Sequence, residues 1–247
     1  MFLLILLGML SAFGPFVTDM YLPSLPAMAD YFSASLPMVQ MGLTTSMIGL
    51  ALGQIFFGPL SDKYGRRPLL LVSMLLFIVS TLFCLFAPDI YSFVTLRLIQ
   101  GIAGAGGIVI SRSVAIDKFS GKELAKMLAV IGAINGVAPV AAPVIGGLLT
   151  GSVGWQGIFM ILLFIGILLG IGCIRFKESL PAEKRSKTGV WATFRSFGII
   201  VHNRRYMLYV FQLAFAQGIL FAYIASSPFI IQQHYGFLLL PSAFALR

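Results

Sequence analysis

Seven long apolar stretches constrain the fold of this chain more than any other feature of its sequence. They cover residues 2–22, 38–60, 69–87, 91–111, 127–149, 155–174 and 207–230. A helix needs about 20 apolar residues to cross roughly 30 Å of hydrocarbon, since each residue advances it by about 1.5 Å. Only 10% of the residues are charged, whereas soluble domains carry roughly 25%. We therefore predict an all-α, polytopic membrane protein and exclude a soluble domain.

Basic residues are confined to alternate connections between these stretches. Almost all of the 17 lysines and arginines lie in the connections 61–68, 112–126 and 175–206. Short loops that retain lysine and arginine stay on the cytoplasmic side of the membrane. We therefore expect a cytoplasmic amino terminus, six helices that run up and down, and a seventh that crosses outward. Because the basic residues are spread among apolar runs, the net charge of +9 does not indicate nucleic acid as a partner.

The connection 175–206 is the one long polar segment, and we place a domain boundary there. It contains a charged run over 181–187 and an amphipathic stretch over 191–200. We predict a six-helix transmembrane domain over 1–174, a basic cytoplasmic linker, and a seventh transmembrane helix with its tail over 207–247. Basic side chains near a membrane surface are attracted to anionic lipid. The linker is therefore expected to lie close to the bilayer.

Small residues recur four apart within the stretches, which places each pair on one helix face. Helices in lipid associate closely where such residues let the backbones touch. The pairs are Gly49/Gly53, Gly101/Ala105, Ala103/Gly107, Gly132/Gly136 and Gly166/Gly170. We expect a helix–helix contact at each of them.

Two prolines fall inside the stretch 127–149. Pro139 and Pro143 each remove a backbone donor, so we expect them to bend the helix. Gly146 and Gly147 follow them closely. Kinked or broken helices in membrane proteins commonly line a pathway. A kink that only improves packing is the alternative.

Two ionisable residues lie within the stretches, where a charge costs at least about 2.5–3.5 kcal/mol. Arg97 lies inside the fourth stretch, and Asp19 lies near the end of the first. Both are expected in the outer part of the membrane, where they can form an ion pair or share a polar cavity. Gln100 and Asn135 are polar groups that can face the same cavity. A static salt bridge between helices, or an Asp19 that meets water at the interface, is the alternative.

The turn around the connection 61–68 carries charges of both signs between two glycines. Asp62 and Arg66 are four apart, so on a helix they share a face and can pair with each other. Arg112 and Asp117, at the end of the fourth stretch, are further candidate partners. A loop that only retained positive charge would need neither Asp62 nor the glycines.

Four motifs resemble those of the major facilitator superfamily, and in particular its drug:proton antiporters of the Bcr/CflA (bicyclomycin-resistance) group. Residues 58–67, Gly-Pro-Leu-Ser-Asp-Lys-Tyr-Gly-Arg-Arg, resemble the loop signature G-x-L-x-D-x-x-G-R-(R/K) between helices two and three. Residues 96–101 resemble the fourth-helix motif. Residues 142–147 resemble the fifth-helix antiporter motif G-P-x-x-G-G, with Ala142 in place of the first glycine. Residues 19–26 resemble the D-x-Y-L-P-x-L-P signature of the group.

The resemblance implies a proton-driven exporter of drug-like or small metabolite molecules in the bacterial inner membrane, working by alternating access. Its partners would be the exported molecule, protons and lipid. It implies a part in proton coupling for Arg97 together with Asp19. The conformational latch that it implies comprises Gly58, Asp62, Gly65, Arg66, Arg67, Arg112 and Asp117, and the bending residues are Pro139, Pro143, Gly146 and Gly147.

Such transporters have twelve helices in two halves, and this chain supplies one half, a linker and a seventh helix. We therefore expect a missing carboxy-terminal half, so that the chain acts as part of a longer one. A truncated, inactive remnant and a half-transporter that must dimerise are the alternatives.

Enzyme chemistry is not expected. His202 and His234 have no carboxylate or cysteine neighbour in sequence that suggests an active site. Cys84 and Cys173 lie inside apolar runs without metal-ligand spacing. We predict no metal and no organic cofactor.

Overall fold

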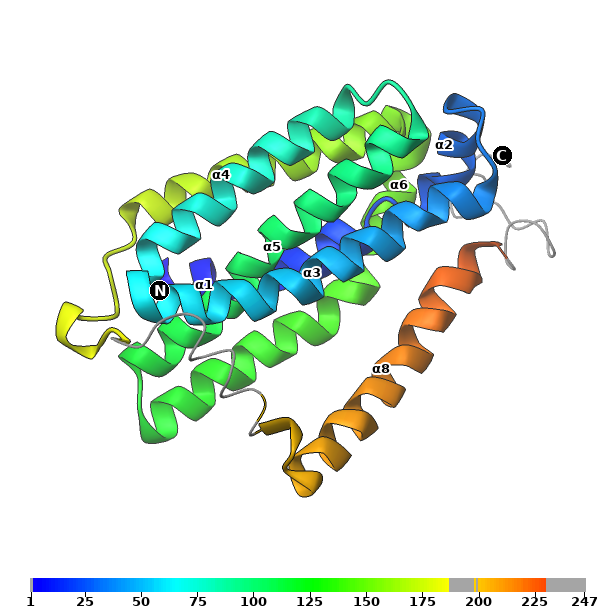
Figure 1. The fold of residues 1–247 in the computed structure, drawn as a ribbon. Helices are drawn as coiled ribbons and strands as arrows, with labels where there is room; N and C mark the ends of the chain where they lie inside the picture. The colour runs from blue at the N-terminus through cyan, green and yellow to red at the C-terminus, as the bar shows by residue number, and fades with distance from the viewer. Residues whose placement is uncertain (1, 187–197, 199, 230–247) are drawn as a thin grey trace, which may run out of the picture. The chain divides into compact units, whose positions relative to one another are not determined.

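The computed structural model describes residues 2–186, 198 and 200–229. All regular structure within these residues is helical (Figure 1). The elements are α1 (Phe2–Asp19), η1 (Leu22–Ser24), α2 (Leu25–Tyr31), α3 (Leu36–Tyr64), α4 (Arg66–Leu85), α5 (Ile90–Lys118), α6 (Gly121–Arg175), η2 (Ala182–Lys184) and α8 (Arg204–Phe229). Several of them are long and apolar enough to cross a membrane. The prediction of an all-α, polytopic membrane protein is confirmed.

The chain divides into two compact units, Met1–Arg185 and Ser186–Arg247. The first unit holds α1 to α6 and η2, and the second holds α8, which covers most of the predicted seventh span. The predicted amphipathic stretch 191–200 lies outside the described residues except at positions 198 and 200. Residues 230–247, which include the predicted tail, also lie outside them.

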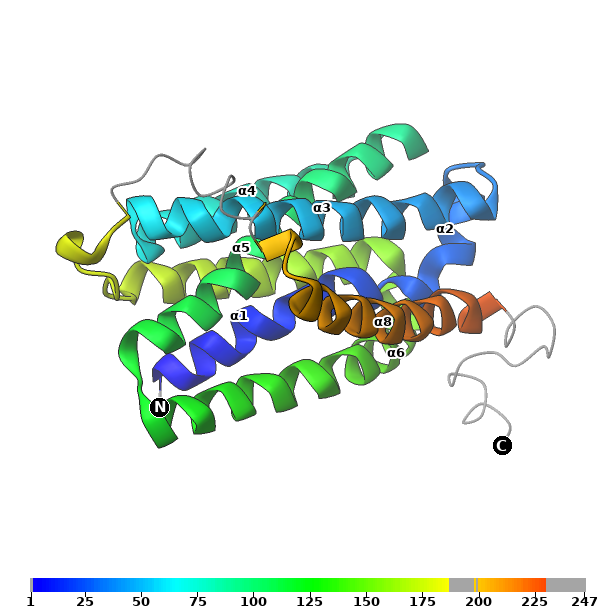
Figure 2. The same ribbon diagram turned by 60° about the horizontal axis from the view of Figure 1, so that its bottom comes forward.

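Helix α6 contains two of the predicted spans. Its 55 residues would extend about 80 Å if straight, well beyond one bilayer. At Gly154 the backbone leaves the helical conformation, with φ 65° and ψ −174°, in a region that favours glycine. The chain reverses direction within α6, so its two parts run antiparallel (Figures 1 and 2). The predicted spans 127–149 and 155–174 therefore correspond to the two arms of α6.

The segment 23–37, which connects the first two predicted stretches, is mostly helical. It contains η1 and the short helix α2, and its Leu25 and Met28 are fully buried. Pro23 and Pro26 each stand in the first turn of a helical element. A proline costs little there, because the amide it lacks would have no partner in that turn.

The connections predicted at 61–68 and 112–126 are shorter than predicted, because the helices continue into these charged segments. Only Gly65 separates α3 from α4, and its φ of 102° requires a glycine. Apolar composition marks where a helix meets lipid, whereas its end is set by turn and capping residues. Asp89 is such a residue: its carboxylate accepts hydrogen bonds from the backbone of Ser92 and Tyr91 at the start of α5. These bonds, with that of Ser92 foremost, hold the pKa of Asp89 below its ordinary value.

Glycines bring α3 and α5 into direct backbone contact. A Cβ at Gly49 would collide with the carbonyl oxygen of Leu98, and one at Gly53 with that of Ile102. Gly101 meets α3 in the same way from the side of α5. The predicted packing at these positions is therefore present.

Of the other small-residue pairs, some contact a neighbouring helix and one does not. On α5, Ala103 is fully buried and Gly107 faces α1, and on α6 Gly166 packs against Phe77 of α4. The prediction was wrong for Gly132/Gly136, since a Cβ at either position would have no atom within 4 Å among the described residues. Spacing identifies a smooth helix face but cannot show whether another helix covers it.

This contrast predicts opposite effects of two alanine substitutions. We expect Gly49→Ala to lower the free energy of unfolding by about 1–3 kcal/mol, because α3 and α5 must move apart. Gly132→Ala should leave it unchanged or raise it by up to about 1 kcal/mol, because alanine is the better helix former. Denaturant titration of the purified chain in detergent micelles, followed by circular dichroism, measures both. Equal effects would contradict the packing described above.

Candidate functional site: a buried arginine and an ion-pair network at a helix turn

Arg97, on α5, is fully buried and links this helix to the end of α1. Its guanidinium donates one hydrogen bond to Oε1 of Gln100 and another, of 2.9 Å, to the carbonyl oxygen of Val17. The last carbonyls of a helix lack intrahelical partners, and α1 ends two residues after Val17. A positive charge at this end of a helix is also favourable. Arg97 thus has a structural role at the end of α1.

Gln100 extends this network to α4. Its Nε2 donates to Oγ1 of Thr81 at 2.7 Å, and the Thr81 hydroxyl donates to the carbonyl of Phe77 at 2.7 Å. Thr81 was not predicted as a site residue. Its sequence position carries no signal, because a threonine in an apolar helix commonly bonds to its own backbone. We call Arg97, Gln100 and Thr81 the Arg97 network.

Asp19, the last residue of α1, is fully buried. Neither carboxylate oxygen has a hydrogen-bond partner among the described residues. Arg97 does not come within ion-pair distance of it, so the ion pair considered for these two residues is absent. A buried carboxylate without a partner is costly, whereas a protonated carboxyl group is neutral. Both predicted residues are nevertheless buried where α1 meets α5.

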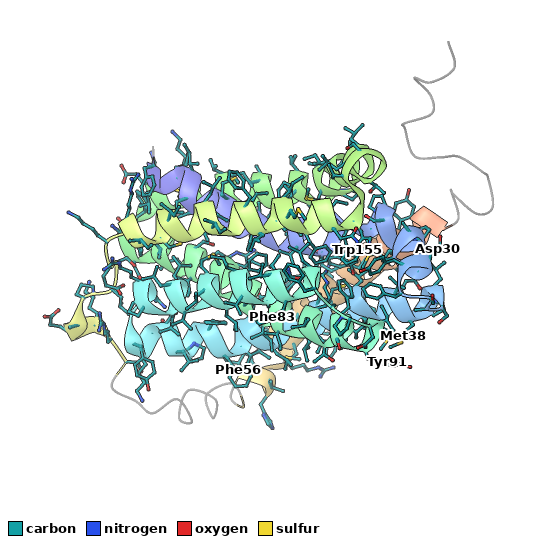
Figure 3. All side chains as sticks on the ribbon, turned by 90° about the horizontal axis from the view of Figure 1, so that it is seen from above. Asp30, Met38, Phe56, Phe83, Tyr91 and Trp155 are labelled. Atoms are coloured by element: carbon teal, nitrogen blue, oxygen red, sulfur yellow. The ribbon has the colours of Figure 1, made fainter. Side chains whose placement is uncertain are left out.

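Aromatic rings surround the guanidinium of Arg97. Its Cζ lies 4.3 Å from the ring centre of Tyr21 and 5.6 Å from that of Phe159. Phe93 and Trp155 continue this cluster, with ring centres 5.6 and 5.9 Å from that of Phe159. Figure 3 places Trp155 at the same end of the bundle as the labelled Asp30. The rings offer favourable faces to the positive charge.

Asn135 and Gln100, which the sequence suggests can face one cavity, bond to different partners. Asn135, on α6, donates to the hydroxyl of Ser11 on α1 at 2.5 Å. Gln100 instead bonds within the Arg97 network. The two amides thus have separate partners among the described residues.

Pro139 and Pro143 lie within α6, which continues through both. Close by, a Cβ at Gly146 would collide with the carbonyl oxygen of Met20, so α6 packs directly on the chain just after α1. A Cβ at Gly147 would lie in ordinary contact with Pro23, at 3.9 Å. The small residues allow this close approach. Bending at the prolines stays a prediction.

A second network lies at the turn between α3 and α4. Arg66 is only 6% exposed and pairs with Asp62 at 2.5 Å and with Asp117, at the end of α5, at 2.9 Å. It also donates to the hydroxyl of Ser61 at 2.7 Å. Both pairings considered for Arg66 therefore occur together. We call Asp62, Arg66 and Asp117 the Arg66 network.

Other residues predicted for this latch have different surroundings. Arg112 is exposed and forms no ion pair among the described residues. Gly58 accepts the hydroxyl of Ser61 through its carbonyl, and a Cβ there would make only an ordinary contact. Arg67 donates to the carbonyl of Ile174 near the end of α6 at 2.8 Å.

Glu178 is a residue of this region that sequence reasoning missed. Its carboxylate accepts hydrogen bonds from the backbone amides of Arg66 and Arg67, the first two residues of α4. It lies in the segment after α6, which the sequence predicts only as a basic linker. The available signal was an acidic residue next to Lys177 in a mostly basic segment.

Comparison with known proteins identifies the family of this chain. A model of the Major Facilitator Superfamily matches residues 4–246. The chain is 42% identical over 234 residues to the "Uncharacterized MFS-type transporter YdgK" of Bacillus subtilis, covering 94% of this chain and 58% of that protein. It is 32% identical over 232 residues to the "Bicyclomycin resistance protein homolog" of Haemophilus influenzae, covering 93% and 58%. It is 26% identical to the "Multidrug resistance protein MdtL" of Salmonella heidelberg, covering 89% and 55%.

The chain thus spans little more than half the length of these curated relatives. Among solved structures, the human organic anion transporter MFSD10 shares the fold, with a TM-score of 0.60 and 19% identity over 76% of this chain and 50% of that one. Family, fold and helical spans agree. The chain is a multi-pass membrane protein that belongs to the Major Facilitator Superfamily, a family of transporters and not of enzymes.

Proposed function

We propose that this chain takes part in proton-coupled efflux of drug-like or small metabolite molecules across the bacterial inner membrane. It would do so by alternating access, as part of a longer chain. The observation that carries the proposal is the fully buried Arg97 near the end of α1, where the carboxyl group of Asp19 has no hydrogen-bond partner in the described part of the chain. Ionisable residues inside a membrane protein commonly mark ion or proton pathways.

The coupling follows from competition for the guanidinium. With Asp19 protonated and neutral, Arg97 bonds to Gln100 and to the carbonyl of Val17. Loss of the proton creates a carboxylate, which attracts Arg97 more strongly than a neutral carbonyl does. The guanidinium then shifts toward Asp19, and the contact between α5 and α1 changes. Proton exchange at Asp19 would thereby bias the bundle between two states.

The Arg66 network would act as the conformational latch. It joins the turn between α3 and α4 to the end of α5, with Gly65 providing the conformation of the turn. Pro139 and Pro143, with Gly146 and Gly147, would let the first arm of α6 bend as the latch opens. Each part thus contributes to a rocking motion of helices about a central cavity.

Relatives support the substrate class. The names of the Haemophilus and Salmonella relatives refer to bicyclomycin resistance and multidrug resistance. Drug-like molecules are therefore the substrates to test first. A membrane potential of about 100 mV supplies about 2.3 kcal/mol for each charge that crosses, which is enough to drive uphill export.

The proposal is tested by dye transport into everted membrane vesicles. Vesicles from cells that produce the 247-residue chain are energised by respiration and supplied with ethidium, with and without the carboxy-terminal half of the Haemophilus relative as a second polypeptide. Dye uptake that a protonophore abolishes, in either arrangement, is the expected result. Absence of such uptake in both arrangements would refute proton-coupled efflux.

Orientation provides a separate prediction. With the amino terminus in the cytoplasm, the exposed Ser35 lies outside the cell and the exposed Ser120 lies inside. A membrane-impermeant maleimide should therefore label Ser35→Cys in intact cells, and Ser120→Cys only after permeabilisation. The native Cys84 and Cys173 are fully buried and should contribute little background. The reverse labelling pattern would invert the topology.

A further inference from the structure

The segment after α6 folds back onto the turn between α3 and α4. Phe176 and Leu180, which flank Glu178, are 4% and 8% exposed and anchor this segment against the bundle. Phe176 packs with the core cluster that also contains Cys173. Residues 176–180 therefore form a packed part of the first unit, and we call them the strap.

Glu178 provides the polar contacts between the strap and α4. Its Oε1 accepts the backbone amide of Arg66 at 3.0 Å, and its Oε2 accepts that of Arg67 at 3.1 Å. Oε1 also accepts the amides of Ser179 and Leu180, at 2.9 and 3.0 Å, which closes the strap on itself. The first amides of a helix lack intrahelical partners and favour a negative charge. Gly65 has no side chain to cap α4, so Glu178 does so from a distant part of the chain.

Gly65 is needed for this approach as well as for its φ of 102°. A Cβ there would lie 2.6 Å from Oε2 of Glu178 and 3.0 Å from Nη2 of Arg185. Real Cβ atoms do not come so close to an oxygen, so a side chain at position 65 would displace the carboxylate. The glycine of the turn and the glutamate of the strap therefore belong to one arrangement.

Two further interactions connect the strap to Asp117, at the end of α5, and to Arg185, later in its own segment. The hydroxyl of Ser179 donates to Oδ2 of Asp117 at 3.1 Å, the same oxygen that Arg66 contacts. Oε2 of Glu178 also lies 3.8 Å from the guanidinium of Arg185, which holds the next part of the segment. The strap thus contacts both the backbone amide of Arg66 and Asp117, an acidic partner of Arg66.

We propose that Glu178 is a positioning residue for the Arg66 network: by capping α4 it holds Arg66 between Asp62 and Asp117. It also connects the linker to the latch, because the strap is the first part of the chain that leads toward the second unit. Movement of the linker that withdraws Glu178 would uncap α4 and release Arg66. The meaning of this release for transport rests on the proposed function, but the positioning itself does not.

The native cysteines report on the strap without added labels. Cys173 lies shortly before Phe176, whereas Cys84 lies at the far end of α4, and both are fully buried. In the full chain in membranes, Glu178→Ala should raise the rate of maleimide labelling at Cys173 about tenfold, the effect expected from losing a charge-assisted hydrogen bond. Labelling at Cys84 should not change. Glu178→Gln, which retains one acceptor oxygen, should give an intermediate rate.

Glu183→Ala is the matched control, since Glu183 is an exposed acid of the same segment with no ion pair among the described residues. It should leave both labelling rates at their original values. A rise at both cysteines in Glu178→Ala would mean general unfolding, and no rise at Cys173 would mean that Glu178 does not hold the strap. Either result would overturn the proposal.

A double-mutant cycle separates positioning of Arg66 from capping alone. Unfolding midpoints of the full chain in detergent are measured for Glu178→Gln, Asp117→Asn and the combination. If Glu178 holds Arg66 against Asp117, the combined shift is smaller than the sum of the single shifts, because either change alone loosens the same contact. Additive shifts would leave Glu178 as a cap only and refute the positioning role. Since no transport is measured, this result is independent of whether the chain exports drugs.

Discussion

Arg97→Ala is expected to abolish proton-coupled dye uptake, with a loss of at least about 100-fold, while the protein still inserts into the membrane. Stability should change little, because two effects oppose each other. The substitution leaves the buried acceptor oxygens of Gln100 and Val17 without a donor, which destabilises the fold by about 1–3 kcal/mol for each. It also removes a charge that costs at least about 2.5–3.5 kcal/mol inside the membrane. Transport is lost because alanine cannot alternate between two sets of acceptors.

The measurement is respiration-driven ethidium uptake by everted vesicles, normalised to the amount of protein in the membrane, in the arrangement that supports uptake by the unchanged chain. Arg175→Ala serves as the control, since Arg175 is an exposed arginine in the last turn of α6. Arg97→Lys keeps the charge but lacks the planar fork that reaches both Gln100 and Val17, so it should retain only part of the activity. Full uptake by Arg97→Ala would remove this residue from the mechanism.

Local patterns predicted much of the fold. The apolar stretches located the transmembrane helices, because their length is set by the bilayer and not by contacts elsewhere in the chain. The spacing of Gly49 and Gly53 identified a face on which α5 packs. The alternating charges of Asp62 and Arg66 indicated a paired turn, and this pairing is present. Each of these predictions depends on residues that are close in sequence.

Interactions between distant segments could not be predicted in the same way. Glu178 contacts the amide of Arg66, 112 positions away. Almost every residue has a backbone amide, so the residue types at positions 66 and 178 do not indicate that the two are in contact. The role of Thr81 could not be predicted either, because it depends on which face of α4 turns toward Gln100. The exposed Gly132 shows the opposite error, in which a packing pattern lacks a partner among the described residues.

Removing Arg66 is expected to have the largest effect on stability. Arg66→Ala leaves the carboxylates of Asp62 and Asp117 without their shared cation, and the side chain of Asp117 is only 13% exposed. Breaking a buried ion pair by removing one partner costs about 3–5 kcal/mol. We expect the free energy of unfolding to fall by about 3 kcal/mol, at the lower end of this range, because Asp62 is half exposed and water can solvate it. Denaturant titration in detergent micelles measures the change.

A second substitution tests whether the orphaned charge is the cause. In the background of Arg66→Ala, Asp117→Asn should restore part of the lost stability, because it removes the uncompensated carboxylate and still accepts the hydroxyl of Ser179. The same Asp117→Asn change in the unaltered chain should destabilise it, because there it weakens the bond to Arg66. A substitution that is harmful alone and beneficial beside Arg66→Ala identifies an ion pair. If Asp117→Asn destabilises both backgrounds equally, Arg66 and Asp117 do not depend on each other, and the latch proposed at this turn loses its physical basis.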